Sequence, residues 1–194
     1  MPGRTARWPL PAASLLLVVL VAWYYLIGTP QYSVYRLTGA LHDRDATGAE
    51  RFIDVNRVAQ SASDVIVVDY LTREPRAAKA LEAFGQGGAR ATAARALEPL
   101  VASRVRAEIK KMADRGGSGP GGFVLPASFV AAFWEPQVAR DGSDVWLTYT
   151  DHRGGQTRFK ASQQPDRSWM ITEFDREWVR RHLRDAPVRD APAG

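Results

Sequence analysis

The sequence predicts an α+β protein: an N-terminal transmembrane helix, a helical first half, an antiparallel sheet of about four strands and a C-terminal helix. Three observations predict this arrangement. Residues 8–35 contain no charged side chain, apolar residues within 29–115 recur at helical steps, and after a Gly-rich segment the period changes to two. Helices that precede an antiparallel sheet are expected to cover one of its faces.

The N-terminal segment has the length and composition of a membrane span. Residues 10–28 are apolar throughout their centre, and a bilayer core of ~30 Å needs about 20 such residues. Pro11 stands where the first turn of a helix tolerates it. Trp23, Tyr24 and Tyr25 cluster at the far end, where aromatic side chains meet the headgroups. We therefore expect a transmembrane helix over 10–28.

The flanking charges predict the orientation of this span. Arg4 and Arg7 precede it, whereas the other flank stays uncharged until Arg36. The positive-inside rule then makes residues 1–9 a cytoplasmic tail of an inner-membrane protein and places everything after residue 28 in the periplasm or outside the cell. A cleaved secretory signal is the competing interpretation. Residues 28–31 offer no small-x-small cleavage site, which favours an uncleaved signal anchor.

Residues 29–115 are expected to form the helical part of the exported domain. The apolar positions of the first two long helices are Val34, Leu37 and Leu41, then Val58, Ala62, Val65 and Val68. A short helix is expected over 75–84, with Pro75 in its first turn. The Ala-rich segment that follows is also helical, and we expect Pro99 to split it and to begin a new helix that runs to about Arg115.

Residues 116–122 predict a flexible loop, because five Gly, a Ser and a Pro fall within 115–122. Residues 123–185 then predict the sheet and a closing helix. Strands are expected over 129–140, 144–150, 157–162 and 168–174, and Val145, Leu147 and Tyr149 share one face of the second. Residues 176–185 return to helical spacing, and 186–194 are expected to be a disordered tail.

The stretch 41–58, LHDRDATGAERFIDVNRV, is the densest group of charges and invites a calcium-loop hypothesis. Counted from Asp43, a Gly falls at position six and Asp54 at position twelve, as such a loop requires. Arg51 at position nine puts a cation where a ligand belongs. The hypothesis is therefore disfavoured.

Helix capping explains the same residues better than a calcium loop does. Asp45 or Thr47 caps the second helix, and Thr47 with Glu50 fits a capping box. Asp54 caps a third helix that begins near Val55. We therefore interpret 41–58 as the connection between helices.

The sequence predicts no catalytic, cofactor-binding or metal-binding residue and no cofactor. It has no Cys, which excludes disulfides, thiolate zinc sites and Cys nucleophiles. His42, His152 and His182 lack metal-ligand spacing, and no hydrolase or phosphate-loop motif occurs. Two of the +5 formal charges come from Arg4 and Arg7, so nucleic acid is not an expected partner. The basic segment 176–185 leaves a weaker hypothesis of binding to a membrane surface or nucleic acid.

Aromatic residues of the sheet region allow two interpretations. Packing in the core is the ordinary role of aromatic strand residues, and lining of a cone-like cavity between sheet and helices is the other. The residues concerned are Phe133, Trp134, Trp146, Phe159 and Trp169.

Residues 29–64 resemble a bacterial family, domain of unknown function 2939. The features that carry the resemblance are Pro30 followed by Tyr32 and Tyr35, then Asp43 and Asp45, then 53–55 and 58–61. Val55 departs from the aromatic residue usual there, and Ala59 from the usual Arg. The segment 168–175, SWMITEFD, is similar to the family's closing strand. The resemblance implies a membrane-anchored envelope protein and transfers no catalytic residue.

We therefore expect a single-pass envelope protein whose exported, non-catalytic domain binds a protein partner or a small apolar ligand. The alternative is an NTF2-like pocket enzyme that uses an Asp or His as its acid or base. A deep pocket that holds Asp or His beside a Tyr would favour the enzyme, and a filled core would oppose it.

Overall fold

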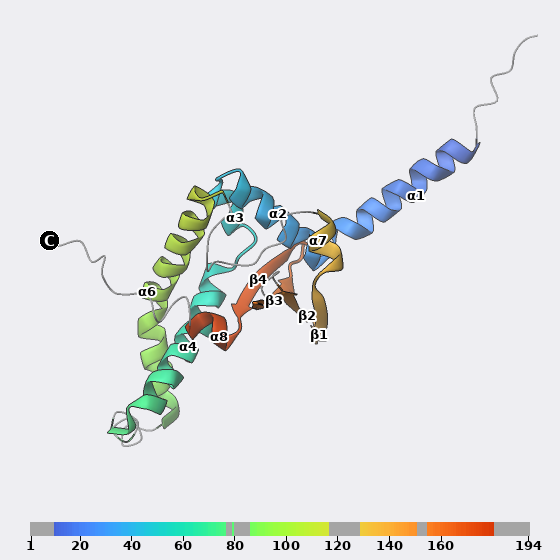
Figure 1. Cartoon of the computed structure of the whole chain (residues 1–194). Coiled ribbons are helices and arrows are strands. Elements are labelled where there is room, and N and C mark those ends of the chain that lie inside the picture. Colours follow the sequence, from blue (N-terminus) through green and yellow to red (C-terminus); the bar gives the residue numbers. More distant parts are fainter. Residues whose placement is uncertain (1–9, 77–78, 80–85, 117–128, 151–154, 181–194) are drawn as a thin grey trace, which may run out of the picture.

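The computed structural model describes residues 10–76, 79, 86–116, 129–150 and 155–180. Its helices are α1 (Leu10–Ile27), α2 (Pro30–His42), α3 (Ala46–Glu50), α4 (Val55–Arg73), α6 (Gln86–Asp114), α7 (Phe129–Trp134) and α8 (Arg176–Val179). Its strands are β1 (Gln137–Asp141), β2 (Asp144–Thr150), β3 (Gln156–Gln163) and β4 (Trp169–Phe174). α4 and α6 pack side by side next to the sheet, and α1 projects away from the other elements (Figure 1). The predicted α+β class is confirmed.

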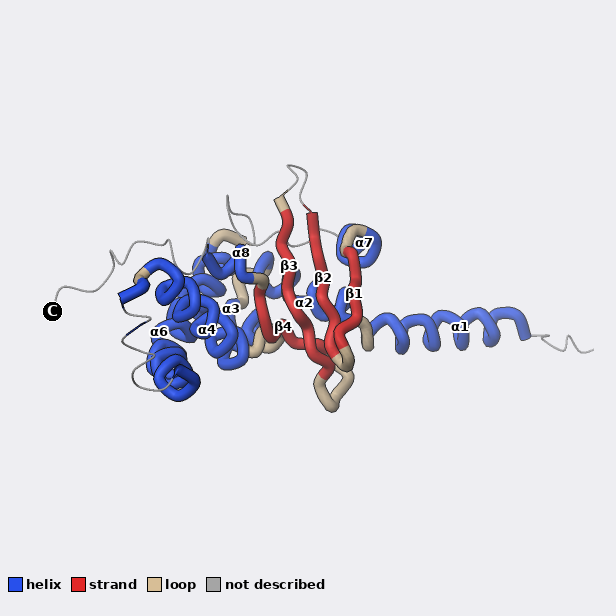
Figure 2. Tube along the Cα trace, turned by 90° about the horizontal axis from the view of Figure 1, so that it is seen from below, coloured by secondary structure: helices blue, strands red, loops and turns tan. Residues whose placement is uncertain are grey.

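The described strands form one antiparallel meander in the order β1-β2-β3-β4, as predicted (Figure 2). Leu147 pairs with Phe159 at the centre of the sheet, and a β-bulge interrupts the β3–β4 register between Lys160 and Ala161. The outer edge of β4 is covered by the chain just before α4. Asp54 donates its backbone N–H to the Ile171 carbonyl at 2.8 Å, so the charged connection between helices also pairs with the sheet.

The core lies between one face of the sheet, here called the inner face, and the helices. Val145, Leu147 and Tyr149 are buried on that face, as the period-two pattern predicts. Phe159 stacks on Tyr149 with ring centroids 5.8 Å apart, and further aromatic contacts continue along the sheet. Burial of each large apolar side chain contributes roughly 1.5–3 kcal/mol. The helical contribution comes mainly from Val34, Leu37, Leu41, Val58, Ala59, Ala62, Val101, Val105, Ile109 and Trp178.

Short polar side chains set the beginnings of the first helices. Thr29 accepts a hydrogen bond from the Tyr32 N–H and caps α2, which begins at Pro30. Asp45 caps α3 by accepting from the Gly48 N–H at 2.8 Å, and Asp54 caps α4. The capping interpretation is confirmed for both acids. The capping box at 47–50 is wrong, because Thr47 already lies inside α3.

The strand expected over 129–140 is wrong in its first half. Residues 129–134 form α7, and the Glu135 N–H donates to the Ala131 carbonyl at 3.2 Å, which continues the helical pattern. Pro136 then has no N–H to donate and holds a fixed φ, so the helix ends before it. The first strand begins only at Gln137.

The expected break at Pro99 is also wrong, because α6 runs without interruption from Gln86 to Asp114. A Pro inside a helix removes one backbone hydrogen bond, and packing of the flanking turns can hold the helix together. Ala94, Val101 and Ala102 on either side of Pro99 are buried against the neighbouring elements. Tertiary packing therefore overrides the local cost.

Several sequence-based expectations fall outside the described residues. These are most of the helix over 75–84, the loop beyond Gly116, His152, His182 and the tail over 186–194. The structure describes the predicted C-terminal helix from Arg176 to Val179. Asp175 caps its N-terminal end by accepting the Trp178 N–H.

No single helix among the described residues has both the length and the apolar composition to cross a membrane. Ser14–Ile27 and Pro30–His42 satisfy both together, with a bend of 77° at the break between them.

Candidate functional site

Side chains fill the gap between the inner face and the part of α2 that holds Val34 and Leu37. The gap bounded by Val34, Leu37, Ala161 and Ile171 has no room for a water molecule. Tyr149 donates its hydroxyl to the Ala132 carbonyl at 3.2 Å. Burial, and then the charge of Glu135, raise the pKa of Tyr149, so its hydroxyl stays protonated. This part of the core therefore leaves no space for a substrate.

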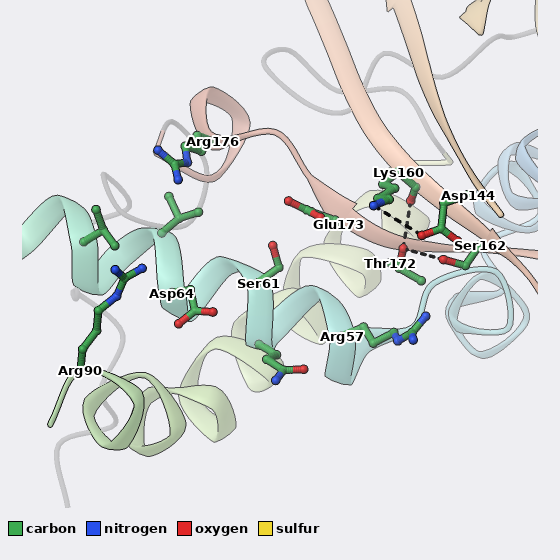
Figure 3. A pocket seen from close by; sticks show the side chains of 13 residues that line it. Arg57, Ser61, Asp64, Arg90, Asp144, Lys160, Ser162, Thr172, Glu173 and Arg176 are labelled. Atoms are coloured by element: carbon green, nitrogen blue, oxygen red, sulfur yellow. Dashed lines mark hydrogen bonds and ion pairs between the residues drawn. The ribbon is translucent and has the colours of Figure 1, made fainter. Parts of the chain in front are cut away.

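A groove of about 480 Å³ opens instead between α4 and the opposite face of the sheet, here called the outer face (Figure 3). We call it the α4 groove. Its walls come from α4, α6 and α8 and from β2, β3 and β4, and its lining is mostly charged or hydroxylated. The lining residues are Arg57, Gln60, Ser61, Asp64, Val65, Val68, Arg90, Asp144, Lys160, Ser162, Thr172, Glu173 and Arg176.

The charges of the α4 groove are only partly satisfied by the protein. Within the described part of the chain, Arg57, Arg90 and Arg176 make no ion pair. Asp64 and Glu173 make none there either. Arg57 and Asp64 project from α4, and Glu173 lies on the facing β4 wall (Figure 3). The groove therefore presents cations and carboxylates that are available to a ligand.

The floor of the groove is a pair of hydroxyls at the β-bulge. Ser162 Oγ and Thr172 Oγ1 lie 3.2 Å apart in a hydrogen bond, and both residues are buried. The bulge adds Thr172 between the residues of β4 that pair with Lys160 and Ala161, which are Glu173 and Ile171. A bulge changes the direction in which neighbouring side chains point. Here it puts Thr172 and Glu173 on the groove side of β4.

Lys160 connects the groove to the rest of the outer face. Its Nζ lies 2.8 Å from Asp141 Oδ2 and 3.4 Å from Asp144 Oδ2. The hydrogen bond from Lys160 lowers the pKa of Asp141, and the same bond raises the pKa of Lys160. Arg158 and Lys160 both lie over the ring of Trp146, at 4.6 and 5.9 Å from its centroid. The charged side chains of this cluster pair with one another, and the groove's groups without an ion pair lie on α4, α6, α8 and β4.

Two acids of the 41–58 stretch are engaged as helix caps. Asp45 and Asp54 each accept a backbone N–H at the start of a different helix. Among the described residues, no three His, Asp or Glu side chains gather closely enough to hold a metal ion. The calcium-loop hypothesis therefore has no support in the geometry.

The aromatic residues singled out in the sequence are distributed over different surroundings. Phe159 is in the core, Trp146 is on the outer face, and Trp134 is 78% exposed. Trp169 packs partly against the core and donates its Nε1–H to the Gly28 carbonyl at 2.9 Å. They do not line one common cavity in the described structure.

Part of the α4 groove has a signal in the sequence. Arg57, Ser61 and Asp64 are spaced by four and three residues, which places them on one face of a helix beside the apolar face of α4. A polar stripe alone is typical of a solvated surface. Only the fold brings Glu173 and Arg176, more than a hundred residues later, to the other side.

Comparison with known proteins connects the helical half to one family. No curated protein and no solved structure matches the chain. A family model, described as a protein of unknown function (DUF2939), matches residues 19–112. That range holds α2, α3, α4 and most of α6, and with them the α4 and α6 walls of the groove. The resemblance seen in the sequence is thereby confirmed over residues 19–112.

Proposed function

We propose that this protein is a single-pass, membrane-anchored envelope protein whose exported, non-catalytic domain holds a polar segment of a partner protein in the α4 groove. The observation that carries the proposal is the set of five charged side chains that line the groove without an ion pair among the described residues. Side chains of this kind are favourable in a groove when a partner supplies the opposite charges.

The anchor is proposed from the sequence and from the exposure of α1. Eleven large apolar or aromatic side chains of α1 are between 41% and 67% exposed, from Leu15 to Ile27. A helix of 18 residues is about 27 Å long, close to the ~30 Å of a bilayer core. With Arg4 and Arg7 before it, this helix would sit in the inner membrane with its N-terminus in the cytoplasm. The domain after it would then be periplasmic or extracellular.

The chemistry of the groove favours a protein segment over a small apolar ligand. An Arg guanidinium forms paired hydrogen bonds with a carboxylate, and Asp64 and Glu173 suit a basic side chain. Ser61 and Gln60 add hydrogen-bonding groups along the α4 wall. A segment that carries both acidic and basic side chains can satisfy all of these groups together. A small apolar molecule would leave them unpaired at a cost of about 1–3 kcal/mol for each group that becomes buried.

Site-specific photo-crosslinking from Gln60 in intact membranes tests the partner site. We expect a discrete crosslinked product that is lost in the Arg57→Glu and Arg176→Glu variants, because each reverses a charge in the groove. Arg104→Glu is the matched control, since Arg104 is exposed on α6 and outside the lining. Crosslinking that stays unchanged in both groove variants would disprove the proposed site.

A reporter enzyme fused after Gly194 tests the orientation separately. We expect a reporter that is active only outside the cytoplasm to be active in this fusion, because the positive-inside rule exports the C-terminal side of the span. A fusion that is active only in the cytoplasm would contradict the proposed topology without bearing on the groove.

The NTF2-like pocket enzyme is the weaker proposal. Helices on one face of an antiparallel sheet agree with that shape in outline. Its acid or base would need a cavity on the inner face, and the gap bounded by Val34, Leu37, Ala161 and Ile171 leaves no room for water. A site for it would therefore have to lie outside this gap.

A further inference from the structure

The turn between β3 and β4 is fastened to the last turn of α1. Arg167 lies over the ring of Tyr24, with its guanidinium carbon 4.5 Å from the ring centroid, and donates a hydrogen bond to the Tyr24 hydroxyl. Trp169 donates its Nε1–H to the Gly28 carbonyl at 2.9 Å. These contacts join positions more than 130 residues apart. These contacts therefore hold this end of the sheet next to the end of α1.

The position of the turn beside the end of α1 would place it at the surface of the bilayer. This inference rests on the proposed membrane anchor. Trp23, Tyr24 and Tyr25 are exposed at the end of α1. Exposed Trp and Tyr at the end of a span lie at the level of the lipid headgroups. Arg167 stacks on Tyr24 and would share that level, with Gly28 beside it.

A pocket of about 460 Å³ opens at the same level. One wall consists of residues 28–31, which follow α1 directly, and the other includes Val138 and Arg140 of β1. This volume lies within the range of roughly 300–1,000 Å³ found for small-molecule sites. The pocket is distinct from the α4 groove and shares only Asp144 with it.

The walls of this pocket combine one cation with an apolar surface. Arg140 is exposed and makes no ion pair within the described residues. Val138 is 46% exposed although its partner in the sheet, Leu147, is fully buried. Pro30 and Trp169 add apolar surface on the opposite side. Asp144 lies 3.4 Å from Lys160, an ion pair that Lys160 shares with Asp141.

We propose that this juxtamembrane pocket binds the headgroup of an anionic phospholipid from the leaflet in which α1 ends. Arg140 holds the phosphate by charge-assisted hydrogen bonds, and Arg167 supplies a second positive charge at the rim. Val138 and Pro30 contact the glycerol and the first acyl carbons. The lipid then fills the space between the anchor and the sheet and fixes how the domain stands on the membrane.

Native mass spectrometry of the full chain in detergent micelles tests the proposal with phosphatidylglycerol and phosphatidylcholine as probes. We expect phosphatidylglycerol to be retained in preference to phosphatidylcholine. Arg140→Gln should weaken its retention about tenfold, the effect of losing one charge-assisted contact. Val138→Asp should weaken it as well, because a carboxylate repels the phosphate. Arg57→Gln in the α4 groove is the matched control and should retain the lipid like the wild type.

Four results would overturn the headgroup site. The first two are equal retention of both lipids and retention that does not change in the Arg140→Gln variant. The other two are displacement of the lipid by inorganic phosphate and a lipid-free dimer that dissociates in the Arg140→Gln variant. Displacement by phosphate would identify a soluble anion site, and the dimer would identify a second copy as the occupant. Arg140 and Val138 are exposed, so both variants are expected to keep the unfolding midpoint of the wild type.

Flotation with phosphatidylcholine vesicles separates failure of the anchor from failure of the headgroup site. The proposed anchor predicts flotation of the wild type and of Arg140→Gln alike, because the apolar span needs no anionic lipid. A chain that floats but shows no selective retention refutes the headgroup site alone. A chain that does not float refutes the anchor and the headgroup site together.

Discussion

The two faces of the same sheet have opposite roles, although they are built from alternate residues of the same strands. On the inner face Leu147 pairs with Phe159, both are fully buried, and aromatic rings stack in sequence. One residue earlier on β2, Trp146 pairs with Lys160 in the sheet, and the cations of Arg158 and Lys160 lie over its ring. The difference is in what covers each face. Helices fill the inner face, whereas the outer face opens into the α4 groove and is left to charged side chains.

The largest predicted effect is on the inner face. Phe159→Ala should lower the free energy of unfolding by about 3–5 kcal/mol, because it removes a fully buried ring between Tyr149 and Phe174. Denaturant unfolding of the full chain in detergent measures this change. The matched variant on the outer face is Trp146→Ala, which should cost only about 1 kcal/mol through lost cation–π contacts. Equal losses would contradict the division of roles between the two faces.

The sequence predicted the inner face well because period-two alternation is a local property. Val145, Leu147 and Tyr149 are buried as expected, and Leu37 and Val58 on the helices are too. The outer face was not predicted as a site, since a row such as Trp146, Thr148 and Thr150 looks the same whether water or a helix lies opposite. Long-range packing decides between these, and no local pattern encodes it.

The second prediction concerns the hydroxyl pair at the floor of the groove. Thr172→Val should lower the free energy of unfolding by about 1–2 kcal/mol, because it leaves the buried Ser162 hydroxyl without its partner. Ser162→Ala together with Thr172→Val should cost less than the sum of the single changes, since neither hydroxyl is then left unpaired. A double-mutant cycle by denaturant unfolding measures the coupling. Strict additivity would show that the two hydroxyls do not depend on each other.

The third prediction concerns the start of the α4 wall. Asp54→Ala should cost about 1 kcal/mol of unfolding free energy, because the carboxylate accepts the Arg57 N–H at the first turn of α4. Asp43→Ala is the matched control in the same stretch, because the Asp43 side chain caps no described helix. Added Ca²⁺ should leave the melting temperature unchanged in the wild type. A calcium-dependent rise that is lost in Asp54→Ala would instead support a calcium loop.

The 41–58 stretch shows where sequence reasoning was sufficient and where it was not. The caps at Asp45 and Asp54 follow from local chemistry, because a short side-chain oxygen satisfies N–H groups only a few residues ahead. The pairing of Asp54 with Ile171 joins residues more than a hundred positions apart. Likewise, Arg57 lines a groove only because β4 and α8 lie on the other side of it. The groove is therefore a property of the fold more than of any one segment.

The smallest predicted effect is on the exposed part of the outer face, where Asp141 meets Lys160 at 2.8 Å. Lys160 holds the pKa of Asp141 below its ordinary value of 3.8, so the pair adds stability above pH 3.8 and loses it as the pH falls through the lower, folded-state pKa. The raised pKa of Lys160 acts at alkaline pH. The stability that Lys160 contributes is complete below its ordinary pKa of 10.5 and is lost as the pH rises through the higher folded-state pKa.

Asp141→Asn should therefore lower the melting temperature slightly at neutral pH, and the difference from wild type should shrink as the medium becomes more acidic than pH 3.8. In a Lys160→Gln background the same change should have a weaker pH dependence, because the main partner that lowers the pKa of Asp141 is gone. Melting curves of the four proteins across acidic pH measure this. A pH dependence that is undiminished without Lys160 would show that Asp141 does not owe its lowered pKa to this ion pair.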